Sequence, residues 1–261
     1  MLSKILLLIL LLLLFTARTR NIAQPVYLPV EYEPEQILHE PEPYVPYEPE
    51  LPEPEQYIPC EPEQEPEPEQ ETFETIFTAE PLPYHIIQQI TGVSFHQNSH
   101  FDYCHLAYLT ITHVDFYGYS RHGHIIVAAS IADEVLDIFQ EIYEYRFPIA
   151  GMRLIDYYYA LDDYSMAANN SVGFNFRYIA GTTTLSRHAW GMAIDINPIQ
   201  NPFIRGDVIL PVAGRYYLDR SDIRPGMIIP GDVVYRAFTS RGWIWGGHWR
   251  VPIDYHHFER R

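Results

Sequence analysis

Apolar and polar residues follow regular patterns from about residues 73–83 to the C-terminus. The apolar run at 124–129 (HIIVAA) predicts a strand. Residues 130–147 then place apolar side chains at helical spacing, namely Val135, Ile138, Phe139 and Ile142. This spacing predicts an amphipathic helix that follows the strand, with Ser130 and Asp133 capping its first turn.

Shorter patterns continue along the chain. Apolar runs predict strands at 152–156, 174–180 and 191–197 and short extended pieces at 242–247 and 254–259. Residues 230–242 predict a helix that starts after Pro230 and ends at Gly242. Because strands and helices follow one another in mixed order, we expect an α+β fold rather than a wound parallel sheet.

The N-terminal pattern is of another kind. Lys4 precedes an apolar run at residues 5–15, which is too short to cross a bilayer comfortably, since a spanning helix needs about 20 residues. The run fits the apolar core of a secretory signal, although Phe15 is bulky for a cleavage site near Ala17. We therefore expect an exported protein in which residues 1–22 are a signal peptide or, alternatively, an uncleaved membrane anchor.

Residues 23–80 are rich in proline and glutamate and are predicted to be a disordered acidic spacer. Residues 31–80 hold 17 acidic residues and no Lys or Arg, so the net charge of −17 arises there and the rest of the chain is balanced. A solvated tether is the simplest interpretation, and binding of a basic partner is the alternative. No basic stripe appears, so we expect no nucleic-acid partner. Cys60 and Cys104 are too few to predict a disulfide framework, and their pairing stays open.

Two stretches carry candidate chemistry, SRHAWGMAIDIN at 186–197 and DYHHFE at 254–259. A hydrolytic metal site needs three protein ligands and one open position. His188 and Asp195 would face opposite sides of a continuous strand, but Gly191 allows the chain to turn between them. The spacing permits their convergence without requiring it, and an ordinary polar histidine and a turn aspartate remain the alternatives.

The two stretches match a known pair of motifs. The pattern Ser-x-His-x-x-Gly-x-Ala-x-Asp is met by Ser186, His188, Gly191, Ala193 and Asp195, and the pattern Asp-x-x-His by Asp254 and His257. With these motifs, residues 87–259 resemble the zinc D-alanyl-D-alanine carboxypeptidases of the VanY-like branch, which share a fold with the hedgehog signalling domain. The resemblance implies a small, mainly antiparallel sheet that carries the zinc site and is flanked by helices.

The resemblance also implies roles for individual residues. His188, Asp195 and His257 would bind Zn²⁺, although this donor set also suits other divalent ions. Asp254 would be the general base, and Arg177 would stabilise the developing oxyanion, with a surface ion pair as its alternative role. Ser186 would be a substrate contact or a turn hydroxyl. Strand alternation places Glu259 on the face of His257, as its partner or merely as a terminal charge, and His256 on the opposite face as a bystander behind the strand.

Several other residues were weighed as candidates. Trp249 could line the pocket, whereas Trp243 and Trp245 are expected to pack against the sheet. Structural or solvent-facing roles are expected for His122, His124 and His248. A polar loop that resembles the substrate-side region of the family contains Asp162, Asp163, Asn169 and Asn170, although turn and capping roles also explain these residues. Motifs of other hydrolase and nucleotide-binding classes, HExxH, GxSxG and the P-loop, are absent from the sequence.

The sequence thus predicts a monomeric zinc carboxypeptidase, with residues 81–261 as the catalytic domain, that hydrolyses peptidoglycan stem peptides in the cell envelope or after secretion. Membrane contact is expected only through an N-terminal anchor. One alternative is an L-alanyl-D-glutamate endopeptidase of the same fold. The other is a non-catalytic zinc-containing module that binds the cell wall, although such a module often lacks the base that Asp254 supplies here.

Overall fold

The computed structural model describes residues 73–96 and 102–261. The predictions for the signal segment, for Cys60 and for most of the spacer lie outside these residues. Within them, helices and small antiparallel sheets are mixed, which confirms the α+β class. No helix in these ranges is both long and apolar enough to cross a membrane. Cys104 is exposed, and its pairing with Cys60 stays open.

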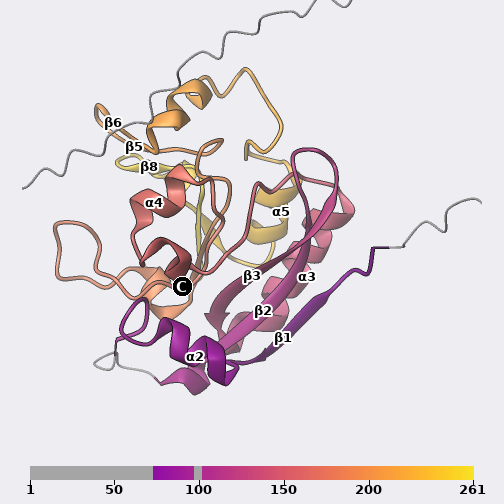
Figure 1. Cartoon of the computed structure of the whole chain (residues 1–261). Coiled ribbons are helices and arrows are strands. Elements are labelled where there is room, and N and C mark those ends of the chain that lie inside the picture. The colour runs from indigo at the N-terminus through magenta and orange to yellow at the C-terminus, as the bar shows by residue number, and fades with distance from the viewer. Residues whose placement is uncertain (1–72, 97–101) are drawn as a thin grey trace, which may run out of the picture. The chain divides into compact units, whose positions relative to one another are not determined.

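The first sheet has the order β1-β2-β3 and is antiparallel (Figure 1). Its strands are β1 (Phe77–Pro81), β2 (Leu106–Val114) and β3 (Ser120–Ala128). In β1, Phe77 and Ala79 pack against the main core, which holds this strand on the sheet. Residues 77–80 are therefore part of the folded domain, and the predicted boundary at residue 81 is too late.

Helix α3 (Ala132–Glu144) lies along this sheet and packs against β2 (Figure 1). Its predicted amphipathic character is confirmed, because Val135, Ile138, Phe139 and Ile142 are all buried in the main core. The predicted capping residues are wrong. Ser130 lies in the short 3-10 turn η2 (Ala129–Ile131), and the residue that caps α3 is Ile131, which has no polar side chain to accept a hydrogen bond.

Two further antiparallel sheets lie closer to the C-terminal part of the chain. One has the order β4-β9-β7, and the other has the order β6-β5-β8. Their strands are β4 (Ala193–Asp195), β9 (His257–Glu259), β7 (Ile244–Trp245), β6 (Val208–Leu210), β5 (Phe203–Arg205) and β8 (Ile253–Asp254). The central residues of β4 and β9, Ile194 and Phe258, are fully buried, so the main core continues beneath the first of these sheets.

The predicted strands at 152–156 and 174–180 are wrong. The first makes one isolated bridge, at Met152, before the 3-10 turn η3 (Ile155–Tyr158), and the second makes one at Tyr178. Both runs are apolar because Leu154 and Phe174 fill a second, smaller core cluster. A short apolar run indicates burial, and periodicity alone does not show whether the buried segment pairs as a strand.

The remaining helices are short. Helix α5 (Val233–Thr239) lies within the predicted 230–242 segment and is capped by Asp232, whose carboxylate accepts from the backbone N–H of Tyr235. Sequence patterns did not predict α2 (Tyr84–Ile90) or α4 (Asp162–Ala167). Further 3-10 turns are η1 (Tyr103–His105), η4 (Arg187–Trp190), η5 (Val212–Tyr217) and η6 (Gly246–His248).

Candidate metal centre

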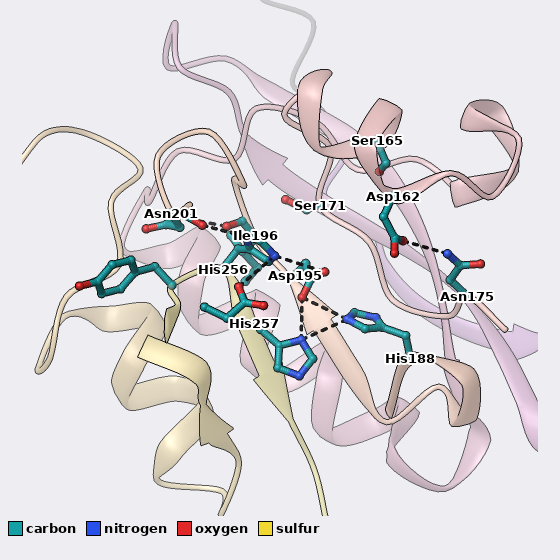
Figure 2. Close-up of polar contacts among 12 residues, drawn as sticks. Asp162, Ser165, Ser171, Asn175, His188, Asp195, Ile196, Asn201, His256 and His257 are labelled. Carbon is teal, nitrogen blue, oxygen red and sulfur yellow. Dashed lines mark hydrogen bonds and ion pairs between the residues drawn. The ribbon is translucent and has the colours of Figure 1, made fainter. Parts of the chain in front are cut away.

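Three buried side chains point toward one another at the edge shared by η4, β4 and β9 (Figure 2). His188 Nε2 lies 3.1 Å from Asp195 Oδ1, His257 Nδ1 lies 2.9 Å from the same oxygen, and the two nitrogens are 3.2 Å apart. Tetrahedral zinc with bonds of 2.0–2.1 Å places its ligand atoms roughly 3.3 Å apart. The three donor atoms are therefore spaced almost as a tetrahedral metal ion requires.

Local backbone geometry explains how residues seven apart converge. The turn η4 carries His188 and ends at Gly191, which has the left-handed φ of 65°. A Cβ atom on Gly191 would lie 2.4 Å from the backbone nitrogen of Ala128 in β3, so only glycine fits this close approach. The chain then enters β4, where Asp195 stands directly opposite His257 of β9. Directly opposed residues share one face of a sheet, and both side chains therefore point to the same place.

The outer nitrogen of each imidazole is held by an acceptor. His188 Nδ1–H donates to the carbonyl of Gly173 at 2.6 Å, and His257 Nε2–H donates to Glu259 Oε2 at 3.4 Å. The lone pairs of the inner nitrogens therefore face the carboxylate oxygen of Asp195. Either a proton or a metal ion must lie between three such atoms, and the donor set fits a divalent metal ion. Glu259 has the contact expected of a partner of His257.

Electrostatics in this buried site also favour a cation. Burial alone would raise the pKa of the Asp195 carboxyl, but the charges of His188 and His256 and hydrogen bonds from His188 and His257 hold it well below its usual value. Burial would lower the pKa of His257, but hydrogen bonds to Asp195 and Glu259 raise it to about 10. The centre therefore holds a proton when no metal is bound, and a metal must displace that proton.

His256 is not the bystander that strand alternation predicts. The chain bends at residues 255–256 between β8 and β9, so the alternation of a continuous strand does not apply. His256 Nδ1–H donates to the Asn201 carbonyl at 2.7 Å, and Nε2 lies 3.0 Å from Asp254 Oδ1 and 3.8 Å from Asp195 Oδ2. Burial opposes a positive charge on this ring, but the charges of Asp254 and Asp195 raise the pKa of His256 to about 9. His256 therefore contacts both the predicted base and a predicted ligand.

Arg177 lies on the wall of the same cleft, where its Nε pairs with Asp162 Oδ2. The Asp162 carboxylate also accepts from Asn175 Nδ2 at 3.0 Å (Figure 2). Asn175 is buried, so this contact holds the Asp162 carboxylate in position. The sequence placed Asp162 in a loop that resembles the family's substrate side, with capping or turn roles as sufficient alternatives, but nothing in its spacing from Arg177 indicates that the two side chains meet.

Ser186 has the local role that was one of its two predicted alternatives. Its hydroxyl accepts from the backbone N–H of His188 at 3.3 Å and so caps η4. Its own N–H donates to the carbonyl of Arg177 at 3.0 Å. Ser186 therefore ties the arginine segment to the turn that carries His188, and it also lines the cleft.

The cleft has a volume of about 330 Å³ and mixes charged and apolar walls. Asp195, Asp254, His256, His257 and Glu259 line one part of it. Its apolar lining includes Val172, Ile179, Phe203, Leu210, Trp249 and Pro252. The Trp249 ring lies 5.3 Å from the His257 ring, which agrees with its predicted place at the pocket.

Comparison with known proteins gives one match. Residues 180–260 match the family model of D-alanyl-D-alanine carboxypeptidase. Over this segment the chain is similar to that family. No curated protein and no solved structure gives a significant match, so the likeness to the hedgehog fold stays a prediction. The family match supports a peptidoglycan peptidase, and the buried His188–Asp195–His257 group supports its dependence on a metal.

The carboxypeptidase match includes both motifs but begins three residues after Arg177. His188, Asp195 and His257 form a group that could hold a metal ion, while the roles of Asp254 and Arg177 stay predictions. A match to a cell-wall peptidase domain suggests an extracellular or envelope location, whereas the signal segment and anchoring stay predictions.

The other candidate residues have contacts of their own. His122 Nε2–H donates to the Glu74 carbonyl, His124 stacks on Tyr108, and His248 packs on Trp245. Asn169 accepts from the backbone N–H of Ile199 and Asn170 from that of Arg153, so both amides join distant segments and do not act within a turn. Trp243 and Trp245 are buried in the core. Asp163 lines the cleft.

Proposed function

We propose that this protein is a zinc-dependent D-alanyl-D-alanine carboxypeptidase that removes the terminal D-alanine from peptidoglycan stem peptides. The observation that carries the proposal is the convergence of His188, Asp195 and His257 beside Asp254 in one cleft, within the segment that matches this family. His188 Nε2, Asp195 Oδ1 and His257 Nδ1 would hold the ion and leave a fourth position toward the cleft. A zinc ion there would supply Lewis acidity, polarising a carbonyl and acidifying water.

Asp254 supplies the proton transfers in this proposal. Its side chain is nearly buried, and Oδ1 lies beside His256 Nε2 at 3.0 Å. Oδ2 is then the atom that takes a proton from the attacking water and passes it to the amine of the departing D-alanine. The low solvent exposure of the carboxylate keeps bulk water away from that transfer.

Arg177 would stabilise the negative charge that builds on the scissile carbonyl oxygen. The pairing of its Nε with Asp162 holds the guanidinium on the cleft wall. The terminal amino groups of the guanidinium then remain to donate to the oxyanion, in a site whose geometry is set before the substrate arrives.

Digestion of purified muropeptides, followed by mass analysis, tests the proposal. The zinc-loaded protein should remove one terminal alanine, a chelator should stop the reaction, and added zinc should restore it. Release of the whole peptide tail from the glycan would instead show the L-alanyl-D-glutamate endopeptidase. No cleavage by a zinc-loaded protein that still binds cell wall would favour the non-catalytic module.

We also propose that residues 24–71 act as a spacer between the membrane and the wall. Shortening this segment should impair digestion of intact wall and spare soluble peptides. Equal loss on both substrates would contradict a spacer role.

A further inference from the structure

Three arginines line the cleft, and they differ in their partners. Arg177 is paired with Asp162, and the Nε and Nη2 groups of Arg187 donate to the carbonyl of Arg260. The Arg205 side chain is exposed and makes no hydrogen bond or ion pair with any residue in the ranges 73–96 and 102–261. Its guanidinium is therefore the cleft cation that remains available to a ligand.

The register of the β6-β5-β8 sheet places Arg205 relative to Asp254. Phe203 of β5 stands directly opposite Asp254 of β8, and Ile204 stands opposite Ile253. Side chains alternate along a strand, so Phe203, Arg205 and Asp254 share one face. Phe203, Arg205 and Asp254 line the cleft, which identifies that face as the one toward the substrate (Figure 1 shows the sheet).

The distances along this face suit one amino acid. Arg205 lies two residues beyond the position opposite Asp254, or about 6.6 Å along β5. Its guanidinium carbon lies 5.9 Å from the centre of the Phe203 ring, so the side chain folds back toward Asp254. In the proposed reaction Asp254 protonates the amine of the leaving residue. The leaving residue carries a carboxylate on the same α-carbon as that amine, within one residue length of it, about 3.5 Å. We therefore expect this carboxylate to lie between Asp254 and Arg205.

We infer that Arg205 is a specificity residue that binds the carboxylate on the α-carbon of the leaving amino acid. The inference rests on the proposed function for the identity of Asp254 as the base. A guanidinium presents paired N–H donors that match a carboxylate, and such charge-assisted bonds are stronger than neutral ones. Two substrate types carry this group: a C-terminal D-alanine, and a D-glutamate that continues the peptide through its side chain.

The test measures equilibrium binding, so it does not depend on turnover. Calorimetry on the zinc-loaded full chain with Asp254→Asn would compare a peptide ending in D-Ala-D-Ala with the same peptide as its C-terminal amide. A second pair would carry D-glutamate as its α-acid or its α-amide. In at least one pair the acid should bind about tenfold or more tightly than the amide. The pair that shows the preference identifies the source of the carboxylate.

Variants at Arg205 complete the test. Arg205→Gln should abolish the preference for the acid, and Arg205→Lys should retain part of it, because a lysine keeps the charge without the paired donors. Arg215→Gln changes an exposed arginine that does not line the cleft and should leave the preference intact. Equal binding of acid and amide in both pairs, or a full preference in Arg205→Gln, would overturn the inference. The two proposals can fail separately. If Arg205→Gln loses the preference for the acid, but the protein with Asp254 unchanged hydrolyses neither peptide, the inference stands and the proposed function is refuted.

Discussion

His257 stands directly across the β4–β9 strand pair from Asp195, with Nδ1 of the imidazole 2.9 Å from Oδ1 of the carboxylate. The pair joins residues that are 62 positions apart in the chain. With His188 on the adjoining turn, it forms a site whose donors face inward and whose outer hydrogen bonds are already made. Three of the five predictions below follow from this arrangement and from the cleft beside it.

Removal of a predicted ligand should remove the metal. His257→Ala should lower zinc affinity by well over 100-fold, because loss of even an outer hydrogen-bond partner of a metal ligand costs 10- to 100-fold. Elemental analysis after dialysis against a chelator of known affinity would measure the loss. His122→Ala alters an exposed histidine on β3 and serves as the matched control. Equal zinc retention by the two variants would contradict the assigned ligand set.

Asp254→Asn should separate metal binding from hydrolysis. Loss of a general base typically reduces the rate by about 10²- to 10⁴-fold, while the three ligand atoms are left in place. Zinc content by elemental analysis and D-alanine release by a coupled assay would be measured on the same sample. Asp219→Asn, which alters an exposed loop carboxylate, should leave both quantities unchanged. Normal turnover by Asp254→Asn would exclude this residue as the base.

Arg177 and Asp162 should act as a unit. Arg177→Gln should lower kcat by about 10²- to 10³-fold if it removes an oxyanion donor. Asp162→Asn should lower kcat on its own, because the guanidinium loses the anchor at Nε, but should have little further effect in the Arg177→Gln background. Steady-state kinetics of the double-mutant cycle would show this coupling, and additive losses would argue against it. Arg121→Gln breaks the exposed pair with Asp115 and is the control.

Gly191→Ala should destabilise the domain and disturb the site. A left-handed φ costs a non-glycine residue about 1–2 kcal/mol, and overlap with the backbone of Ala128 adds about 1–3 kcal/mol. Gly231 also has a positive φ, but no atom lies within 4 Å of the position that a Cβ would take. Gly231→Ala should therefore lose only the stability that the left-handed φ costs. Urea unfolding would compare the two variants, and the result would count against the steric argument if their losses were equal.

The buried His113 should make stability depend on pH. Burial lowers the pKa of His113 below the usual 6.5, and the charge of Arg121 lowers it further. These effects outweigh the backbone hydrogen bonds at Val114 and Ile149 and the charge of Asp115, which raise it. Above pH 6.5 the ring is neutral in both states, so stability is complete. As the pH falls from 6.5 toward the folded pKa, the unfolded chain binds a proton that the folded chain does not, and stability falls by at most about 1.4 kcal/mol per pH unit.

Urea unfolding at pH 7.5 and pH 5.5 would measure this effect. His113→Leu removes the titrating group and keeps an apolar side chain in the buried position. The variant should therefore lose less stability between the two pH values than the unaltered chain. An identical pH dependence would show that His113 does not titrate in this range.

The sequence by itself determined the helix at 132–144, because burial of one face leaves a 3.6-residue pattern that needs no partner to be recognised. It also predicted the group His188, Asp195 and His257, because these residues stand in two motifs that resemble those of a known family. The short apolar runs at 152–156 and 174–180 were misassigned because burial in a small core cluster resembles burial in a strand.

Only the tertiary structure decided which side chains meet. The bend at residues 255–256 turns His256 toward Asp254, against the alternation that a straight strand would impose. The pairing of Arg177 with Asp162, and the place of Arg205 on the face that carries Asp254, arise from contacts between distant segments. Local periodicity records which face of an element is buried, but it carries no information about strand register or about which charged groups that register brings together.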